Sequence, residues 1–359
     1  MTNNKIILED LDAIMQSDID WIRFANKTVL ITGANGFLPA YMVESLLFVN
    51  KCQHINVKVL ALVRNINKAK VRFKDYLEDK NLVFLEQDVC NEIKINENES
   101  IDFIVHAASQ ASPKYYGTDP VGTLSSNILG TLNLLNLARK FSIESFLYFS
   151  SGEVYGQVND ENNPVMEDYY GYLDPTNVRS CYGESKRMGE NICVSYHHQY
   201  GINTKIVRPF HTYGPGMQLN DGRVYADFVA DVINGRDIEI KSDGLAQRAF
   251  CYLKDATIAF FKVLLKGASG QAYNVGNPEA ESSIIELAET LVGLSNNAIK
   301  INRIKRVNSD QYLKSPIPRN TPNVNKLKTL GWKPETTIVD GFRRTIDSYY
   351  SQNLILNYK

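Results

Sequence analysis

The feature that most constrains this chain is a short apolar run that ends in two spaced glycines. Residues 27–32, with the sequence KTVLIT, are typical of a strand buried on both faces of a parallel sheet. Gly33 and Gly36 follow, and a helical pattern begins at Phe37. Glycines at such a turn permit close approach of the backbone, and a helix N-terminus attracts anions. The segment predicts a loop for the pyrophosphate of a dinucleotide, with an ordinary strand-to-helix turn as the alternative.

Strands and helices alternate along the first two thirds of the chain. This alternation is typical of parallel strand pairing, and it predicts an α/β fold with a doubly wound parallel sheet. The pattern places further strands at 57–63, 82–85, 103–106, 145–150 and 204–208, and helices at 37–49, 121–141 and 182–200.

Three segments differ in pattern. Residues 1–26 predict a short helical leader that packs on the domain or on a partner subunit. Residues 27–214 predict a dinucleotide-binding domain of the Rossmann type that also carries the catalytic residues. Residues 215–359 are less regular and rich in turn signals. They predict a smaller C-terminal substrate-binding lobe, interleaved with the Rossmann domain in a single structural unit.

Charge and cysteine content exclude several classes of protein. The formal net charge is −1, without the basic excess of a nucleic-acid-binding protein. No apolar run is long enough to span a membrane, and the acidic N-terminus does not resemble a signal peptide. The five cysteines lack the spacing of a zinc site. We therefore expect a cytoplasmic protein with reduced thiols and no metal site.

The ends of the next three strands bear on the coenzyme. Arg64 follows the second strand, where a carboxylate usually holds the ribose of NAD, so it favours the 2′-phosphate of NADP. A solvated basic loop is the alternative. Asp88 follows the third strand and is expected near the adenine. His106, Ala107 and Ala108 end the fourth strand with two small residues, as needed where the backbone passes close to a coenzyme.

A tyrosine, a lysine and a serine form the candidate catalytic group. Tyr182 and Lys186 are four residues apart in a predicted helix, so the phenol and the ammonium group share one face. A nearby positive charge lowers the pKa of a tyrosine, which can then accept a hydroxyl proton. Ser151 follows the fifth strand, at the sheet edge where open α/β folds bind ligands. Together with the glycine loop, these residues predict oxidation or reduction at a hydroxyl-bearing carbon.

The chain resembles the extended short-chain dehydrogenases of the nucleotide-sugar epimerase/dehydratase family over residues 27 to about 345. Within that family the motifs are most similar to those of the UDP-glucuronate decarboxylase branch. The matching stretches are 106–113 with Tyr116 and Pro120, 127–131, 150–156, 179–187, 220–224 and 248–255.

The resemblance implies a role for individual residues. It implies Ser151, Tyr182 and Lys186 as the catalytic triad, with Glu153 as the acid or base of a second step, and Asn127 as a structural or relay residue. The expected coenzyme contacts are Gly33, Asn35, Gly36, Phe37, Leu38, Arg64, Asp88, Val89, Ala107, Ala108, Asn127, Tyr182 and Lys186. The expected substrate contacts are Tyr116, Ser151, His211, Arg223, Arg248 and Arg319.

Three of the expected substrate contacts are arginines, which suit a doubly charged diphosphate. Surface solvation is the alternative, and it is favoured more for Arg319 than for Arg248, which precedes an apolar run.

Two positions depart from the family pattern. Dehydratases of the family carry Asp-Glu, and decarboxylases Ser-Glu, where this chain has Gly152 and Glu153. The missing acid argues against a simple 4,6-dehydratase. His211 replaces the usual asparagine of the RPxNxYGP stretch. We expect it to contact substrate, with a hydrogen-bonded structural histidine as the alternative.

The sequence therefore predicts an NAD- or NADP-dependent enzyme that oxidises C4 of a nucleotide-diphosphate sugar, with chemistry like that of UDP-glucuronate decarboxylase. The alternatives are a dTDP-glucose 4,6-dehydratase-like enzyme, a 4-epimerase and a 4-keto-sugar reductase, the last favoured if the coenzyme is NADP. A cofactor-binding regulatory protein without activity is a further alternative, against which the intact triad argues. We expect a homodimer, with neither nucleic acid nor membrane as a partner.

Overall fold

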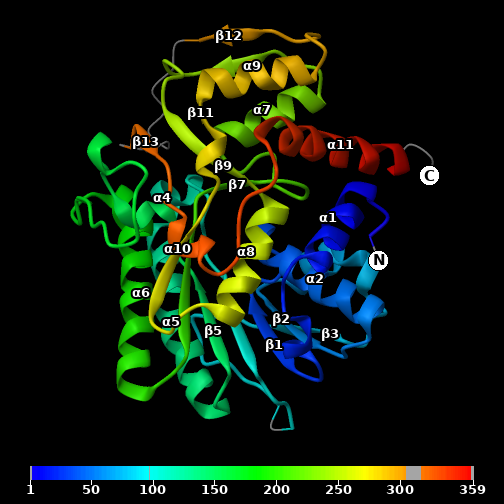
Figure 1. Cartoon of the computed structure of the whole chain (residues 1–359), viewed down its shortest axis with the longest axis vertical. Helices are drawn as coiled ribbons and strands as arrows, with labels where there is room; N and C mark the ends of the chain where they lie inside the picture. Colours follow the sequence, from blue (N-terminus) through cyan, green and yellow to red (C-terminus); the bar gives the residue numbers. More distant parts are fainter. Residues whose placement is uncertain (1, 97, 305–316, 357–359) are drawn as a thin grey trace.

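A computed structural model describes residues 2–96, 98–304 and 317–356 of the chain. The centre of this part is a sheet of seven parallel strands in the order β10-β6-β5-β4-β1-β2-β3 (Figure 1). Its strands are β1 (Thr28–Thr32), β2 (Lys58–Val63), β3 (Leu82–Glu86), β4 (Phe103–His106), β5 (Ser145–Phe149), β6 (Thr204–Pro209) and β10 (Gln271–Val275).

Helices cover both faces of this sheet. On one face α5 (Pro120–Phe141) packs beside α6 (Cys181–Tyr200). On the other face α2 (Phe37–Gln53) packs beside α8 (Leu253–Lys266), and α1 (Lys5–Gln16) lies across both of them (Figure 1). The result is a layered α/β fold of the Rossmann type, which confirms the predicted fold class.

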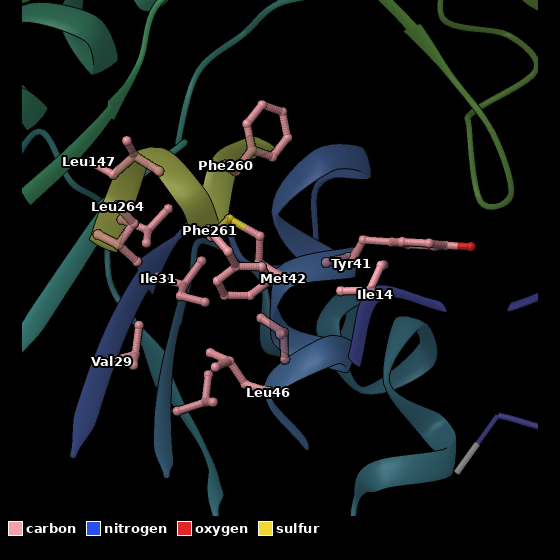
Figure 2. Close-up of a cluster of buried hydrophobic side chains, with 14 of the residues drawn as sticks. Ile14, Val29, Ile31, Tyr41, Met42, Leu46, Leu147, Phe260, Phe261 and Leu264 are labelled. Carbon is pink, nitrogen blue, oxygen red and sulfur yellow. The ribbon is translucent and has the colours of Figure 1, made fainter. Parts of the chain in front are cut away.

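The two faces of the sheet are buried in separate apolar cores. Ile31 of β1 packs with Met42 of α2 and with Phe261 and Leu264 of α8 in the first core (Figure 2). Leu30, the neighbour of Ile31, points to the opposite face and joins the α5–α6 core. Because every residue of β1 is buried, the strand reads in the sequence as a continuous apolar run.

The smaller lobe has its own apolar core, built around Phe250 and Phe342. Its helices are α7 (Val224–Ile233), α9 (Ile284–Leu294) and α11 (Ile338–Leu356). Its strands are β7 (His211–Tyr213), β8 (Ile238–Ile240), β9 (Gln247–Tyr252), β11 (Glu281–Ser283), β12 (Ile301–Arg303) and β13 (Arg319–Asn320). β9 pairs with β7, β11 and β13, and β8 pairs with β12.

Short helical segments complete the described chain. The short α-helices are α3 (Ile66–Arg72), α4 (Lys114–Thr118) and α10 (Asn325–Lys328). The 3-10 segments are η1 (Trp21–Phe24), η2 (Lys74–Tyr76), η3 (Gly152–Tyr155), η4 (Asp160–Asn162), η5 (Val178–Ser180) and η6 (Pro278–Ala280).

The segment after residue 215 contributes to both parts of the molecule. The sequence pattern there is irregular, yet α8 packs on the central sheet and β10 pairs with β6 as its edge strand. β10 was not predicted because its five residues, QAYNV, carry neither a long apolar run nor a clear alternation. The chain therefore leaves the central layer for the smaller lobe and then returns to it.

The N-terminal leader packs on the domain. Asp10 of α1 is buried and accepts hydrogen bonds from the hydroxyls of Tyr41 (3.1 Å) and Tyr252 (2.7 Å). Arg344 of α11 forms an ion pair with the same carboxylate at 2.8 Å. One carboxylate thus joins α1, α2, β9 and α11. None of the helices within the described ranges is both long enough and apolar enough to cross a membrane.

Candidate active site

The loop between β1 and α2 has the geometry of an anion site. Gly33 has a φ of +61°, and a Cβ at this position would lie 2.8 Å from the Cα of Ala108. Gly36 is the N-cap of α2, and its backbone makes the turn without a side-chain cap. The N–H groups of the first helical turn, at Phe37 and Leu38, have no acceptor within the helix. The cradle fits a pyrophosphate, which supplies such acceptors.

Asn35 and Pro39 complete this loop. Asn35 is half-buried between the two glycines, and Pro39 is buried as the third residue of α2. The proline replaces the third glycine of the dinucleotide pattern. It is tolerated because the N–H groups of a first helical turn have no helical acceptor to lose.

Thr32 and His106 link the ends of the two adjacent strands β1 and β4. Thr32 Oγ1 accepts hydrogen bonds from the N–H groups of Ala107 and Ala108, both at 3.2 Å. It also lies 2.9 Å from His106 Nδ1. Burial, followed by the charge of Lys186, lowers the pKa of His106 to about 3, so the imidazole is neutral. These contacts fix the small-residue stretch against the glycine loop.

The other expected coenzyme contacts lie at the same edge of the sheet. Arg64 is exposed directly after β2. Asp88 is half-buried after β3, and its carboxylate accepts the N–H of Cys90 at 2.9 Å. Val89 is buried against α5, where a Cβ on Gly130 would lie 2.9 Å from the valine side chain. The parallel sheet brings these strand ends beside the first turn of α2.

Tyr182 and Lys186 lie one turn apart at the start of α6. Lys186 Nζ donates to the carbonyl oxygen of Phe149 at 2.6 Å and lies 5.7 Å from the centroid of the Tyr182 ring. Burial lowers the pKa of Lys186 to about 7, and the negative charge of Glu190 acts in the opposite direction. The two groups expected on one helical face therefore lie together.

Ser151 lies beside the same phenol. A lowered pKa was expected for Tyr182 from the nearby lysine, but burial raises it to about 12. A hydrogen bond with Ser151 and then the charge of Arg223 act in the opposite direction. Ser151 also caps η3, because its Oγ accepts the N–H of Glu153 at 3.2 Å. The tyrosine, the lysine and the serine thus form one cluster at the carboxyl edge of the sheet.

Asn127 supports this cluster from α5. Its side chain is fully buried, and Nδ2 donates to the hydroxyl of Ser185 at 2.9 Å and to the carbonyl of Thr123 at 3.1 Å. Its Oδ1 is buried without a hydrogen-bond partner among the described residues. Asn127 therefore joins α5 to the turn of α6 that carries Tyr182 and Lys186.

Glu153, Arg179 and Tyr116 lie next to one another beside Tyr182. Two guanidinium nitrogens of Arg179 each lie 3.3 Å from a carboxylate oxygen of Glu153. Arg179 Cζ also lies 4.7 Å from the centroid of the Tyr116 ring. That ring stacks on Tyr182, with centroids 5.0 Å apart and 15° between the planes. Tyr116 is buried, and its hydroxyl donates to the carbonyl of Ala111 at 3.0 Å.

His211 and Arg223 come from the smaller lobe. Arg223 pairs with Asp221 at 2.9 Å and donates to the carbonyl of Ala111, in the loop after β4, at 3.1 Å. Burial lowers the pKa of His211 well below its usual value, and the charges of Arg248 and then Arg223 add to this effect. Its Nδ1 is buried without a hydrogen-bond partner among the described residues. His211 is therefore a neutral ring close to two cations.

Arg248 and Arg319 have different surroundings. Arg248 donates to the carbonyls of Ile317 at 2.8 Å and Pro318 at 3.0 Å. Arg319 forms a two-point ion pair with Glu281, with nitrogen–oxygen distances of 2.6 and 2.7 Å. Of the two residues, Arg248 is the one whose charge contributes to lowering the pKa of His211.

Comparison with known proteins agrees with this arrangement. The model of the NAD dependent epimerase/dehydratase family matches residues 29–276. The chain is 34% identical over 318 residues to UDP-glucuronic acid decarboxylase 5 of Arabidopsis thaliana, covering 88% of this chain and 87% of the relative.

The chain belongs to the NAD dependent epimerase/dehydratase family. The resemblance inferred from the motifs is therefore confirmed, and this family member is an enzyme that depends on a nicotinamide coenzyme.

Solved structures show how widely the fold of this family member is shared. Epimerase Mth375 from Methanothermobacter thermautotrophicus has a TM-score of 0.80 at 21% identity, covering 100% of this chain and 99% of that one. A UDP-glucuronic acid 4-epimerase from Bacillus cereus, in complex with UDP-glucuronic acid and NAD, has a TM-score of 0.75 at 22% identity, covering 90% and 99%. At these identities the likeness concerns the fold alone.

Sequence reasoning missed two features of this family member's site. Arg179 belongs to a stretch that matches the family, residues 179–187, but no role was predicted for it. Its place three residues before Tyr182 could have suggested one. The second is a buried ion pair of Arg208 with Glu190, at 2.6 Å. The Glu190 carboxylate also accepts a hydrogen bond from the hydroxyl of Ser150 at 2.5 Å. Glu190 lies four residues after Lys186, and this helical spacing was the available signal.

Proposed function

We propose that this enzyme oxidises C4 of a nucleotide-diphosphate uronic acid and then decarboxylates it, as UDP-glucuronate decarboxylases do. The position of Tyr182 carries the proposal. The phenol lies beside Ser151 and Lys186. Burial raises its pKa, and the charge of Arg223 of the smaller lobe acts against this rise. A proton acceptor and a cation that suits an anionic substrate thus lie where the two lobes meet.

Three residues of the cluster have separate roles in the oxidation at C4. Tyr182 takes the proton of the C4 hydroxyl, and Ser151 hydrogen-bonds the same oxygen. Lys186, held by the carbonyl of Phe149, lies close enough to the phenol for its protonated form to favour the phenolate. When bound, the nicotinamide coenzyme supplies the hydride acceptor for this oxidation. A ketone at C4 makes a carboxylate at C5 labile, because the carbanion left by carbon dioxide is delocalised into the ketone.

The cations of the smaller lobe support an anionic sugar. His211 is neutral, and its buried Nδ1 is available to a ligand hydrogen bond. Arg223 and Arg248, whose charges reach His211, suit a diphosphate or a carboxylate. Tyr116 lies between Tyr182 and Arg179, so we assign it to the support of the tyrosine as well as to the substrate side. Arg319, which is paired with Glu281, is the weaker candidate for a substrate contact.

Gly152 is the observation that favours a second candidate function. The residue before Glu153 has no side chain, so it cannot supply the acid that a dehydratase uses, nor the serine of the decarboxylases. A Cβ at Gly152 would lie 3.2 Å from the ring of Phe210, which fills that space. C4 oxidation followed by return of the hydride to the opposite face of the ketone, which is 4-epimerisation, needs neither group. The alternative product is therefore a C4 epimer.

Arg64 bears on the choice of coenzyme. The family model describes NAD dependence, and the glycine loop fits either NAD or NADP. Arg64 is exposed after β2, where an acidic residue would select NAD. We propose that NADP binds at least as well as NAD, through ion pairing of the 2′-phosphate with Arg64.

The outer sides of α5 and α6 support a homodimer. These two helices pack against each other and expose large apolar side chains to solvent. The exposed fractions are 69% for Val121, 46% for Leu129, 48% for Met188 and 41% for Val194. Apolar surface on neighbouring helices is typical of an interface.

A cytoplasmic location is supported by the five cysteines, each of which is free in the structure.

A panel of UDP-, dTDP-, GDP- and CDP-sugars tests the proposed function. Each sugar is incubated with the enzyme and either coenzyme, and the products are identified by mass spectrometry. The proposal expects turnover of uronic acids, with loss of carbon dioxide. Turnover of neutral hexoses alone would contradict the proposed substrate class.

A further inference from the structure

The surroundings of Tyr182 include a cation outside the triad. Arg179 is nine-tenths buried and lies in η5, which leads directly into α6. One side of its guanidinium faces the Glu153 carboxylate, with two nitrogen–oxygen distances of 3.3 Å. Its Cζ lies 4.7 Å from the centroid of the Tyr116 ring. Arg179 therefore contacts two residues, and each of them neighbours the catalytic phenol.

Tyr116 transmits this contact to Tyr182. The two rings are stacked, with 15° between their planes and centroids 5.0 Å apart. Tyr116 cannot turn freely, because its hydroxyl donates to the carbonyl of Ala111 and its side chain is 2% exposed. A guanidinium near one aromatic ring and a second ring stacked on the first form a rigid column.

Glu153 reaches Tyr182 by a different route. Its backbone N–H donates to Ser151 Oγ, and Ser151 hydrogen-bonds the Tyr182 phenol. The charge of Glu153 raises the pKa of Tyr182, whereas the charge of Arg179 lowers it. An ion pair between the two brings these opposite charges together, so their effects on the pKa of the phenol oppose each other.

We propose that Arg179 is a positioning residue: it pairs with the Glu153 carboxylate and holds the Tyr116 ring against Tyr182, and so fixes the phenol for proton transfer. This proposal rests on the proposed function, because it gives Tyr182 the role of the base. Arg179 acts through Glu153 and Tyr116, and no contact between Arg179 and the substrate is needed.

Several polar and charged groups surround the Tyr182 phenol, and a titration must separate the effect of Arg179 from theirs. They come from every element that packs around Tyr182 and comprise Glu153 of η3, Ser151 before it, Arg179 of η5, Tyr116 of α4, Tyr148 of β5, Lys186 of α6 and Arg223 before α7. Of these, only Glu153 and Arg179 form the ion pair that the proposal concerns.

The experiment compares Arg179→Met and Arg179→Lys in the full chain. Ionisation of Tyr182 is followed by tyrosinate absorbance in the coenzyme complex, as the difference between each variant and the same variant carrying Tyr182→Phe. The pH profile of kcat/KM is measured alongside. Arg179→Met is expected to raise the midpoint of Tyr182 above that of the wild type, because it leaves the Glu153 charge unpaired. Arg179→Lys keeps the charge and is expected to restore most of the midpoint.

Arg187→Met is the matched control. Arg187 lies on α6, donates to the carbonyls of Val154 and Gly171, and pairs with Glu184 at 3.4 Å, so it anchors the same region. Its loss is expected to lower thermal stability without moving the Tyr182 midpoint. If Arg179→Met behaves like Arg187→Met, Arg179 is merely structural and the proposal is overturned.

Two further outcomes keep the proposal open to refutation. A rise in KM confined to uronic acids, with an unchanged midpoint, would make Arg179 a substrate contact and overturn the proposal. If Arg179→Met does not fold, Glu153→Gln replaces it, and the proposal then expects the midpoint of Tyr182 to fall. The titration needs no sugar, so it still tests Arg179 if the wild-type enzyme oxidises none of the sugars and the proposed function fails.

Discussion

The ammonium group of Lys186 lies 5.7 Å from the centroid of the Tyr182 ring, one helical turn further along α6. Its proton is directed at the carbonyl oxygen of Phe149, 2.6 Å away, at the carboxyl end of β5. The helix sets the spacing of the two side chains and the strand end sets the direction of the lysine. The pair is therefore held in place before any ligand binds.

Replacement of the base tests the assignment of Tyr182. Tyr182→Phe is expected to lower kcat by roughly a hundredfold or more, the usual contribution of a general base, since the ring and its packing remain. Binding of coenzyme and sugar, measured by calorimetry, is expected to stay close to wild type. A variant that keeps more than about a tenth of the wild-type rate would show that another group takes the proton.

Burial of Lys186 predicts a pH-dependent stability. Its pKa is about 7 in the folded protein, whereas the ordinary value for a lysine, as in the unfolded chain, is 10.5. Below about pH 7 the lysine is charged in both states, so the cost of burying the charge is fully present. Between pH 7 and 10.5 the unfolded chain binds more protons, so this cost is relieved as pH rises. Lys186→Met removes the cost.

Urea unfolding of the coenzyme-free protein checks this expectation. The stability gain of Lys186→Met over wild type is expected to be largest near about pH 6 and smaller near about pH 9. A gain that stays constant, or grows with pH, would mean that the lysine is solvated in the folded protein.

Much of the central layer could be predicted from the sequence, for a physical reason. Strands such as β1 and β5 are buried on both faces, so they read as largely apolar runs, and the glycine loop marks where the first one ends. β10 carried no such run, and it is found only because the chain returns to the sheet after α8. Its place is set by tertiary contacts rather than by local pattern.

The site divides in the same way. Tyr182 and Lys186 could be identified because four residues span one helical turn, which is a local relation. Arg179 and Tyr116 are distant in the sequence. The contact of Arg179 with the Tyr116 ring, which stacks on Tyr182, depends on how α4 packs against η5. No spacing rule encodes such a contact. The pairing of Arg319 with Glu281 was hidden for the same reason.

Arg64 predicts the order of coenzyme affinities. Arg64→Ala is expected to weaken NADP binding by roughly tenfold or more, the loss of one charge-assisted contact, and to leave NAD binding nearly unchanged. Dissociation constants of both coenzymes, measured for both proteins, check this. Much tighter binding of NAD than of NADP in the wild type, with no effect of the substitution on NADP, would exclude the proposed phosphate contact.

Arg248 separates two kinds of substrate contact. A planar guanidinium can bind a carboxylate at two points, which a lysine cannot copy. If Arg248 seats a uronic acid carboxylate, Arg248→Lys is expected to cost roughly one to three kcal/mol in kcat/KM for uronic acids only. Steady-state kinetics with matched UDP-hexose and UDP-uronic acid pairs measure this difference. An equal loss for both members of each pair would assign Arg248 to the diphosphate.

Incubation of the wild-type enzyme with UDP-glucuronate and either coenzyme tests the central claim most directly. The reaction is followed by carbon dioxide release and by the mass of the nucleotide sugar. Carbon dioxide is expected together with a UDP-pentose, lighter than the substrate by the mass of carbon dioxide when the hydride returns to C4, and by two further hydrogens when the hydride stays on the coenzyme. If neither product forms, and UDP-glucuronate stays unchanged or is converted only into its C4 epimer, the decarboxylase account is contradicted.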